Sequence, residues 1–201
     1  MDFKDMKFNT RIIHEGQAHD PVTGAHVSPI YQTSTYVLPN TEEAIRLNQN
    51  QDQGFTYTRF GSPSAAELER KIALLENAEA ALAVSSGMAA ISTALLTLLK
   101  EGDHLIAGDV IYGCTFALVK NVLTNFGIEV TLVDTTDISQ IEGAIRPNTK
   151  CIYIETPANP TLRITDIEEV TKLAHKNGAK VIVDSTFASP YLQRPLDLGA
   201  D

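Results

Sequence analysis

The sequence predicts an α/β domain with a mainly parallel sheet, preceded by an extended N-terminal arm. Short apolar segments alternate with helical periodicity from residue 62 onward, which is typical of strands covered by helices on both faces. The first 61 residues instead carry scattered turn residues with little periodicity. The 201-residue length and 43% hydrophobic content supply one substantial core, or one core and part of another.

Each expected element follows from a start signal or from an apolar run. The capping box of Ser64 and Glu67 predicts a helix over 64–76, and that of Thr165 and Glu168 predicts a helix that stops at Gly178. Further helices are expected at 87–99, 113–125 and 137–145. Strands are expected at 80–84, 104–107, 129–133, 151–154 and 180–183.

Charge and composition exclude several classes of function. A net charge of −9 argues against a nucleic-acid or anionic-membrane partner, and no apolar run approaches the roughly 20 residues of a membrane span. Cys114 and Cys151 cannot build a disulfide framework, and the N-terminus lacks a signal-peptide stretch, so we expect a cytoplasmic protein. Cys151 lies in an apolar strand and is expected in the core. The arm histidines lack the ligand spacing of a metal site, so no metal is expected.

Residues that follow the apolar strands are the site candidates, because open α/β sheets bind ligands at the carboxyl ends of their strands. Gly87 lies in a strand-to-helix turn, where helix N-terminal amides can bind phosphate. Asp184 follows a fully apolar strand, and a carboxylate there needs a cation such as a protonated ring nitrogen. Tyr112 can stack on a planar ligand or exchange a proton, and Asn159 offers an amide. Each residue alone also fits an ordinary turn or capping role.

Five motifs follow one another along the chain, and their combination is more specific than any one of them. They are YTRFGSPS (57–64), SSGMAA (85–90), YGCTF (112–116), IETPANP (154–160) and VIVDSTF (181–187). In their order and spacing these motifs resemble the cysteine and methionine metabolism family of pyridoxal-phosphate enzymes, which have the aspartate-aminotransferase fold (fold type I). The resemblance covers nearly the whole chain and implies a pyridoxal 5'-phosphate cofactor and a carbon–sulfur lyase acting on a sulfur amino acid.

The resemblance assigns the cofactor phosphate to two parts of the chain. Gly87 and Met88 would bind it through backbone amides, while Tyr57 and Arg59 would reach the phosphate of a neighbouring subunit's cofactor. The chain would then consist of an arm, residues 1–61, that reaches a neighbouring subunit, and part of the cofactor-binding domain, residues 62–201. This implies a homodimer with shared active sites, and the family resemblance points to a tetramer of two such dimers.

The resemblance also implies which residues would contact the pyridine ring of the cofactor. Asp184 would keep its nitrogen protonated, Asn159 would contact its phenolic-oxygen side, and Thr186 would lie near the ring or the phosphate. Tyr112 would stack on the ring and protonate the leaving sulfur, provided that nearby positive charge lowers the pKa of its phenol.

Substrate preference depends on Cys114, which follows Tyr112 by two residues. A cysteine there resembles the family members that cleave methionine, so we expect γ-elimination of L-methionine to methanethiol, 2-oxobutanoate and ammonia. Cleavage of cystathionine or another trans-sulfuration reaction is the alternative. Cys114 would otherwise be a small loop residue without substrate contact.

The family's Schiff-base lysine lies in a Ser-x-Thr-Lys run shortly after the strand of Asp184, and the 201 residues contain no such run. The substrate-carboxylate arginine and the C-terminal domain of the family are also missing. We therefore expect these residues to be the first portion of an enzyme of about 400 residues. A non-catalytic cofactor-binding or assembly protein is one rival interpretation. A nucleotide-binding doubly wound domain is another, although neither G-x-G-x-x-G nor a Walker lysine is present.

Overall fold

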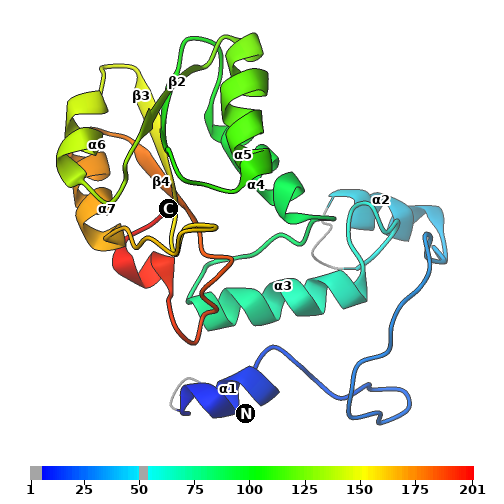
Figure 1. Ribbon diagram of the computed structural model, residues 1–201. Coiled ribbons are helices and arrows are strands. Elements are labelled where there is room, and N and C mark those ends of the chain that lie inside the picture. The colour runs from blue at the N-terminus through cyan, green and yellow to red at the C-terminus, as the bar shows by residue number, and fades with distance from the viewer. Residues whose placement is uncertain (1–5, 50–53) are drawn as a thin grey trace. The chain divides into compact units, whose positions relative to one another are not determined.

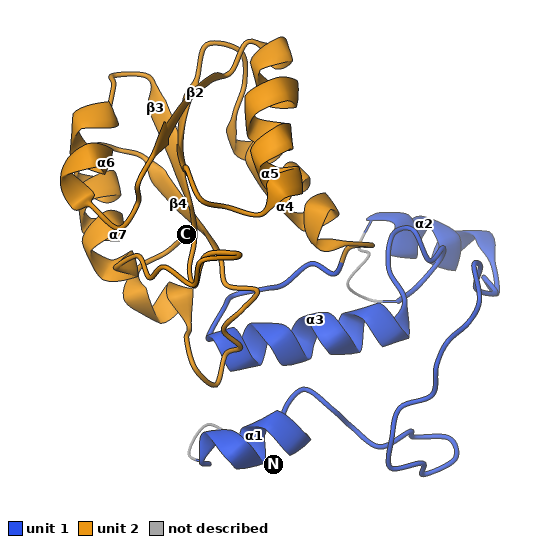
Figure 2. Cartoon of the chain, in the orientation of Figure 1, with its two compact units in different colours: residues 1–83 blue, residues 84–201 orange. Residues whose placement is uncertain are grey.

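The computed structural model of the chain describes residues 6–49 and 54–201. The chain forms two compact units, residues 1–83 and residues 84–201 (Figure 2). The arm expected at 1–61 includes residues 1–5 and 50–53, which lie outside the described residues. Within 6–49 and 54–201, no helix is long and apolar enough to cross a membrane.

The second unit contains a parallel sheet of four strands in the order β2-β1-β3-β4 (Figure 1). All but one of the predicted strands are confirmed, and so is the parallel sheet. The strands are β1 (His104–Gly108), β2 (Glu129–Val133), β3 (Thr149–Glu155) and β4 (Lys180–Asp184).

Helices cover both faces of this sheet, giving three layers (Figure 1). Successive residues of a strand point to opposite faces, so Leu105 and Ala107 of β1 pack in one core cluster and Ile106 packs in the other. The first cluster lies under α4 (Gly87–Leu98) and the helical segment at 113–126. The second lies under α6 (Ile138–Ala144) and α7 (Ile167–Lys176). A short 3₁₀ turn, η4 (Pro195–Leu198), follows β4.

The helix predicted at 113–125 forms, but its hydrogen-bond pattern changes along its length. It begins as α5 (Gly113–Ala117), continues as the π-helical η2 (Leu118–Val122) and ends as the 3₁₀-helical η3 (Leu123–Phe126). Val119 and Leu123 remain fully buried in the first core cluster. Packing of these apolar residues thus holds the segment helical despite its irregular hydrogen bonds.

The first unit contains three helices among its described residues, two of them in the range expected to be extended. These are α1 (Phe8–His14), α2 (Thr41–Gln49) and α3 (Pro63–Glu76). The α1 helix is tied to α3, because the Arg11 guanidinium donates a hydrogen bond of 2.7 Å to the Leu74 carbonyl. Just after α1, the backbone at Gly16 passes close to the backbone of α3 at Lys71. Only a glycine permits this approach, because a Cβ at residue 16 would lie 2.8 Å from the Cα of Lys71.

Both predicted capping boxes place the helix start at the wrong residue. The N-cap of α3 is Ser62, whose hydroxyl accepts the Ala65 N–H, whereas the Ser64 hydroxyl accepts the N–H of Tyr31. The N-cap of α7 is Asp166 rather than Thr165. The Thr165 side chain is instead hydrogen-bonded to the Thr135 hydroxyl at 2.8 Å. In both cases a long-range contact uses the hydroxyl that the local pattern assigned to the cap.

The strand predicted at 80–84 does not form. An apolar segment becomes a strand only when a neighbouring strand completes its hydrogen bonds, and the described residues provide no ladder partner for this one. The Ala83 N–H donates instead to the Glu69 carboxylate at 2.8 Å, and Leu82 is largely exposed. The segment is therefore an irregular connection that leads toward α4.

Candidate active site

A pocket of about 310 Å³ lies in the second unit at the carboxyl ends of β3 and β4. Its volume is within the range of small-molecule sites. The lining combines a helix N-terminus, two carboxylates, an amide and two aromatic rings. The lining residues are Ser86, Gly87, Met88, Ile91, Tyr112, Glu155, Asn159, Asp184, Thr186 and Phe187.

The strand order explains why the pocket forms here. In the order β2-β1-β3-β4 the chain leaves β1 toward one edge of the sheet and then returns to the other side of β1, so β1 and β3 flank a switch point. Tyr112 belongs to the loop after β1, and Glu155 ends β3. Loops that diverge at a switch point leave a crevice between them, which is the usual ligand site of such sheets.

The N-terminus of α4 contributes hydrogen-bond donors to the pocket. Ser86 is the N-cap, and its hydroxyl accepts the Ala89 N–H at 3.1 Å. Backbone amides in the first turn of a helix lack intrahelical acceptors, so those of Gly87 and Met88 are suited to an anion. A Cβ at Gly87 would meet no heavy atom within 4 Å, so the space beside this turn is open.

Asp184 ends β4, and both oxygens of its carboxylate accept hydrogen bonds. Oδ2 accepts the hydroxyl of Tyr153 at 2.9 Å, and Oδ1 accepts the N–H of Thr186 at 3.1 Å together with its hydroxyl. Oδ1 thus has two donors and Oδ2 has one, so Oδ2 still has a free lone-pair direction and can accept a further donor from the pocket. The Tyr153 hydroxyl was not predicted as part of the site, although Tyr153 and Glu155 share one face of β3 by strand alternation.

Glu155 is a pocket residue that the sequence analysis did not identify. Its side chain is only 5% exposed, and its carboxylate accepts the backbone N–H of Tyr112 at 2.8 Å and that of Asn159 at 2.7 Å. One buried carboxylate thus joins the loop after β1 to the loop after β3. The available signal is its place in the IETPANP motif, in which the sequence analysis identifies Asn159 instead.

Tyr112 presents its ring to the pocket with 43% of its surface exposed. Its hydrogen bond with the Cys114 side chain raises the pKa of its phenol. This corrects the expectation that nearby positive charge lowers that pKa. Cys114 is exposed and contacts Tyr112, but it does not line the pocket. Cys151 is buried as expected, and burial raises the pKa of its thiol to about 12.

The pocket therefore gathers six of the residues predicted for the site. These are Gly87, Met88, Tyr112, Asn159, Asp184 and Thr186. Tyr57 and Arg59 belong to the first unit, where the Arg59 guanidinium lies 5.0 Å from the centre of the Tyr57 ring. Tyr57 is also fixed by a bridge to Thr35, and both Tyr57 and Arg59 are exposed. The first unit thus presents a cation and a phenol together on its surface.

The pocket fits a planar, anionic cofactor such as pyridoxal phosphate. The free amides of the α4 N-terminus match a phosphate, and the Tyr112 ring matches a flat heterocycle. The Asp184 carboxylate, already oriented by Tyr153 and Thr186, matches a protonated ring nitrogen. The fold and the site together define a fold-type-I, cofactor-dependent enzyme domain.

Comparison with known proteins agrees with this class. Residues 9–201 match the Cys/Met metabolism PLP-dependent enzyme family. The chain belongs to this family, whose members use pyridoxal phosphate.

Individual relatives carry two different activities. The chain is 50% identical over 202 residues to L-methionine gamma-lyase of Fusobacterium nucleatum subsp. polymorphum, covering 100% of this chain and 51% of that protein. It is 47% identical over 196 residues to cystathionine gamma-lyase of Bacillus subtilis (strain 168), covering 98% of this chain and 49% of that protein.

A solved structure has the same fold. The crystal structure of cystathionine gamma-lyase from Lactobacillus plantarum, complexed with L-serine, matches with a TM-score of 0.88 and 47% identity. The match covers 98% of this chain and 49% of that one. The chain spans about half the length of the curated relatives it matches.

Proposed function

We propose that the full-length enzyme catalyses the pyridoxal-phosphate-dependent γ-elimination of L-methionine. Water and L-methionine would give methanethiol, 2-oxobutanoate and ammonia, with the carbon–sulfur bond broken and no external oxidant needed. The observation that carries this proposal is the pocket at the carboxyl ends of β3 and β4, which gathers six residues of the family motifs around one space. The 50% identity to an L-methionine gamma-lyase supports methionine as the substrate.

Asp184 would have the central electrostatic role. The cofactor, when bound, supplies an electron sink for the electron pair left at the substrate Cα, and that sink is deepest when its ring nitrogen is protonated. The Asp184 carboxylate would hold that proton on the nitrogen, because an adjacent negative charge favours the cationic form of a base. Thr186 and Tyr153 would keep the carboxylate in place through their hydrogen bonds.

Gly87 and Met88 would bind the phosphate through the amides of the α4 N-terminus, and Asn159 would contact the phenolic-oxygen side of the ring. Tyr57 and Arg59 would bind the phosphate in a neighbouring subunit, because a guanidinium forms two parallel hydrogen bonds with phosphate oxygens. The active unit would then be a homodimer, and we propose a tetramer of two such dimers.

Two free cysteines suit a reducing compartment, so we also propose a cytoplasmic location.

Tyr112 would stack on the ring and deliver its phenolic proton to the departing sulfur. The hydrogen bond with Cys114 raises the pKa of this phenol, which keeps the proton on its oxygen until a strong base is generated beside it. A thiolate leaving from Cγ is such a base. Cys114 would then tune the acid through its contact with Tyr112 rather than by lining the pocket.

Cystathionine is the alternative substrate, supported by the 47% identity to a cystathionine gamma-lyase. An apolar pocket distinguishes two thioethers by only about 1–3 kcal/mol, so we expect overlapping activities. The deciding experiment is the ratio of kcat/KM for L-methionine to that for L-cystathionine in the full-length holoenzyme. A ratio above one supports the proposal, and a ratio well below one moves the assignment to cystathionine. A protein that binds the cofactor but releases no product from either substrate would contradict both assignments.

A further inference from the structure

Glu155 is an acidic side chain buried at the edge of the pocket, and within residues 6–49 and 54–201 it forms no ion pair with a cationic side chain. It ends β3 in register with Asp184 at the end of β4, and both residues line the pocket. A buried carboxylate is costly unless hydrogen bonds replace its water. At Glu155 those hydrogen bonds come from the main chain.

The two oxygens of Glu155 have separate partners. Oε1 accepts the Asn159 N–H at 2.7 Å, and Oε2 accepts the Tyr112 N–H at 2.8 Å. Tyr112 lies 43 residues before Glu155, whereas Asn159 lies four residues after it. The carboxylate therefore links two loops that diverge at the switch point and that lie far apart in the sequence.

We infer that Glu155 is a positioning residue that sets the ring of Tyr112 and the amide of Asn159 in one fixed relation around the cofactor. This inference rests on the proposed function, in which those two residues contact the cofactor ring. Glu155 acts through its neighbours' backbone, so it is not itself assigned contact with the reacting atoms. Since both oxygens point at amide hydrogens, its role is to orient rather than to exchange a proton.

Glu155→Gln tests this role with almost no change in shape. A glutamine has one acceptor oxygen and one donor nitrogen, so one of the two backbone N–H groups would face another N–H group. The loop of Tyr112 or that of Asn159 would then lose its anchor. Hydrogen bonds to charged groups contribute more than neutral ones, so we expect a loss of about 10- to 100-fold in cofactor affinity.

The matched control is Glu129→Gln, which makes the same chemical change at the opposite end of the sheet. Glu129 starts β2, and its carboxylate accepts hydrogen bonds from Arg146 and Asn148. This variant removes a charge and weakens polar contacts without touching the pocket. Any effect of lost charge or general destabilisation would appear in both variants.

The experiment compares full-length holoenzymes by two measurements that do not depend on turnover: the dissociation constant of pyridoxal phosphate and the visible circular dichroism per bound cofactor. We expect Glu155→Gln to raise the dissociation constant at least tenfold and to halve the dichroism, with Glu129→Gln within twofold of wild type. If Glu155→Gln fails to fold, Glu155→Asp, which retracts the carboxylate by one methylene, is measured in its place with the same expectations.

Values within twofold of wild type for the Glu155 variant would overturn the positioning role, and so would equal changes in the Glu129 control. A wild-type enzyme that binds no pyridoxal phosphate would instead contradict the proposed function. A double-mutant comparison adds a further check. The effect of Glu155→Gln on kcat/KM should shrink at least threefold when Tyr112→Ala has already removed the ring, and full additivity would contradict action through Tyr112.

Discussion

The phenolic hydroxyl of Tyr153 donates a hydrogen bond of 2.9 Å to Oδ2 of Asp184. Tyr153 is fully buried, and burial together with the adjacent Asp184 carboxylate raises the pKa of its phenol. The hydroxyl therefore keeps its proton at any ordinary pH and always acts as the donor. A permanent buried donor fixes the direction of the Asp184 carboxylate.

Replacing Tyr153 with phenylalanine removes this donor while keeping the packed ring. A hydrogen bond to a charged group contributes about 1.5–3 kcal/mol, so kcat/KM of the full-length enzyme should fall roughly 10- to 100-fold. Steady-state kinetics measure the loss, with the exposed Tyr191→Phe as the control for the same chemical change. A Tyr153→Phe enzyme with kcat/KM within twofold of wild type would show that Asp184 does not depend on this bond.

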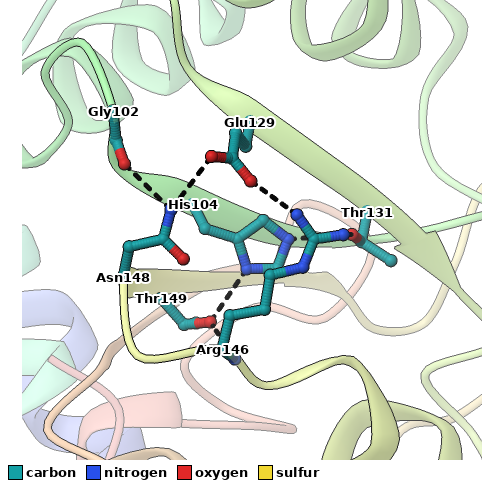
Figure 3. A network of polar contacts seen from close by, with 7 residues as sticks. All are labelled: Gly102, His104, Glu129, Thr131, Arg146, Asn148 and Thr149. Atoms are coloured by element: carbon teal, nitrogen blue, oxygen red, sulfur yellow. Dashed lines mark hydrogen bonds and ion pairs between the residues drawn. The ribbon is translucent and has the colours of Figure 1, made fainter.

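A second polar network surrounds His104 at the amino end of the sheet (Figure 3). Its ring nitrogens lie 2.8 Å from the hydroxyls of Thr149 and Thr131. The charged groups facing it are Arg146 and Glu129, which form an ion pair with each other. Burial, aided by the Arg146 charge, holds the pKa of His104 below its usual value.

This network predicts that acid destabilises the fold through His104. The folded protein binds the proton more weakly than the unfolded chain does. The contribution of His104 to the free energy of unfolding is therefore fully present above the unfolded pKa of about 6.5. It is lost as the pH drops from there through the folded pKa, by at most about 1.4 kcal/mol per pH unit. Urea unfolding at pH 7.5 and 5.5 measures the change. His104→Gln should reduce this pH dependence and the exposed His26→Gln should retain it, so an unchanged slope in His104→Gln would refute the assignment.

Sharing of the active site between subunits is tested with two inactive variants, Arg59→Ala and Asp184→Ala. If Arg59 acts on the neighbouring site, a hybrid dimer has one site in which both residues are intact. Random mixing makes half of the dimers hybrid with one working site each, so we expect about a quarter of wild-type activity. Kinetic assay of the refolded mixture decides the question, because a site contained within one subunit would recover nothing.

The two cysteines should differ sharply in reactivity. Cys114 is exposed, whereas Cys151 is fully buried and its thiol has a pKa raised to about 12. Thiolate is the reactive form, so iodoacetamide at pH 8 should modify Cys114 and leave Cys151 intact in the folded protein. Peptide mass mapping measures both sites, and urea-unfolded protein provides the control in which both react. Equal labelling of the two cysteines in the native state would contradict the buried position of Cys151.

The parallel sheet and most of the pocket were predictable because they depend on local patterns. Asp184 is recognisable as the first polar residue after an apolar strand, and Gly87 as a turn residue before a helix. Strand ends of a parallel sheet meet at one edge, so these residues converge once the alternation of strands and helices is identified.

The features that escaped prediction depend on contacts between distant residues. The Ser64 hydroxyl binds the N–H of Tyr31 and so leaves the cap of α3 to Ser62. Glu155 gains its role from the loop of Tyr112, 43 residues away, and no local pattern reveals that pairing. The pKa of Tyr112 likewise depends on how the Cys114 side chain is turned, which spacing alone does not fix.

The most direct test of the proposed function is the rate of methanethiol and 2-oxobutanoate formation from L-methionine by the full-length enzyme and its Asp184→Asn variant. Asparagine keeps the size of the side chain but removes the charge that would hold the proton on the cofactor ring nitrogen. We predict product formation by the wild-type enzyme and a loss of roughly 100-fold or more in the variant, which should still fold and bind pyridoxal phosphate. Near-normal turnover by Asp184→Asn would contradict the role assigned to this carboxylate and with it the proposed chemistry of the pocket.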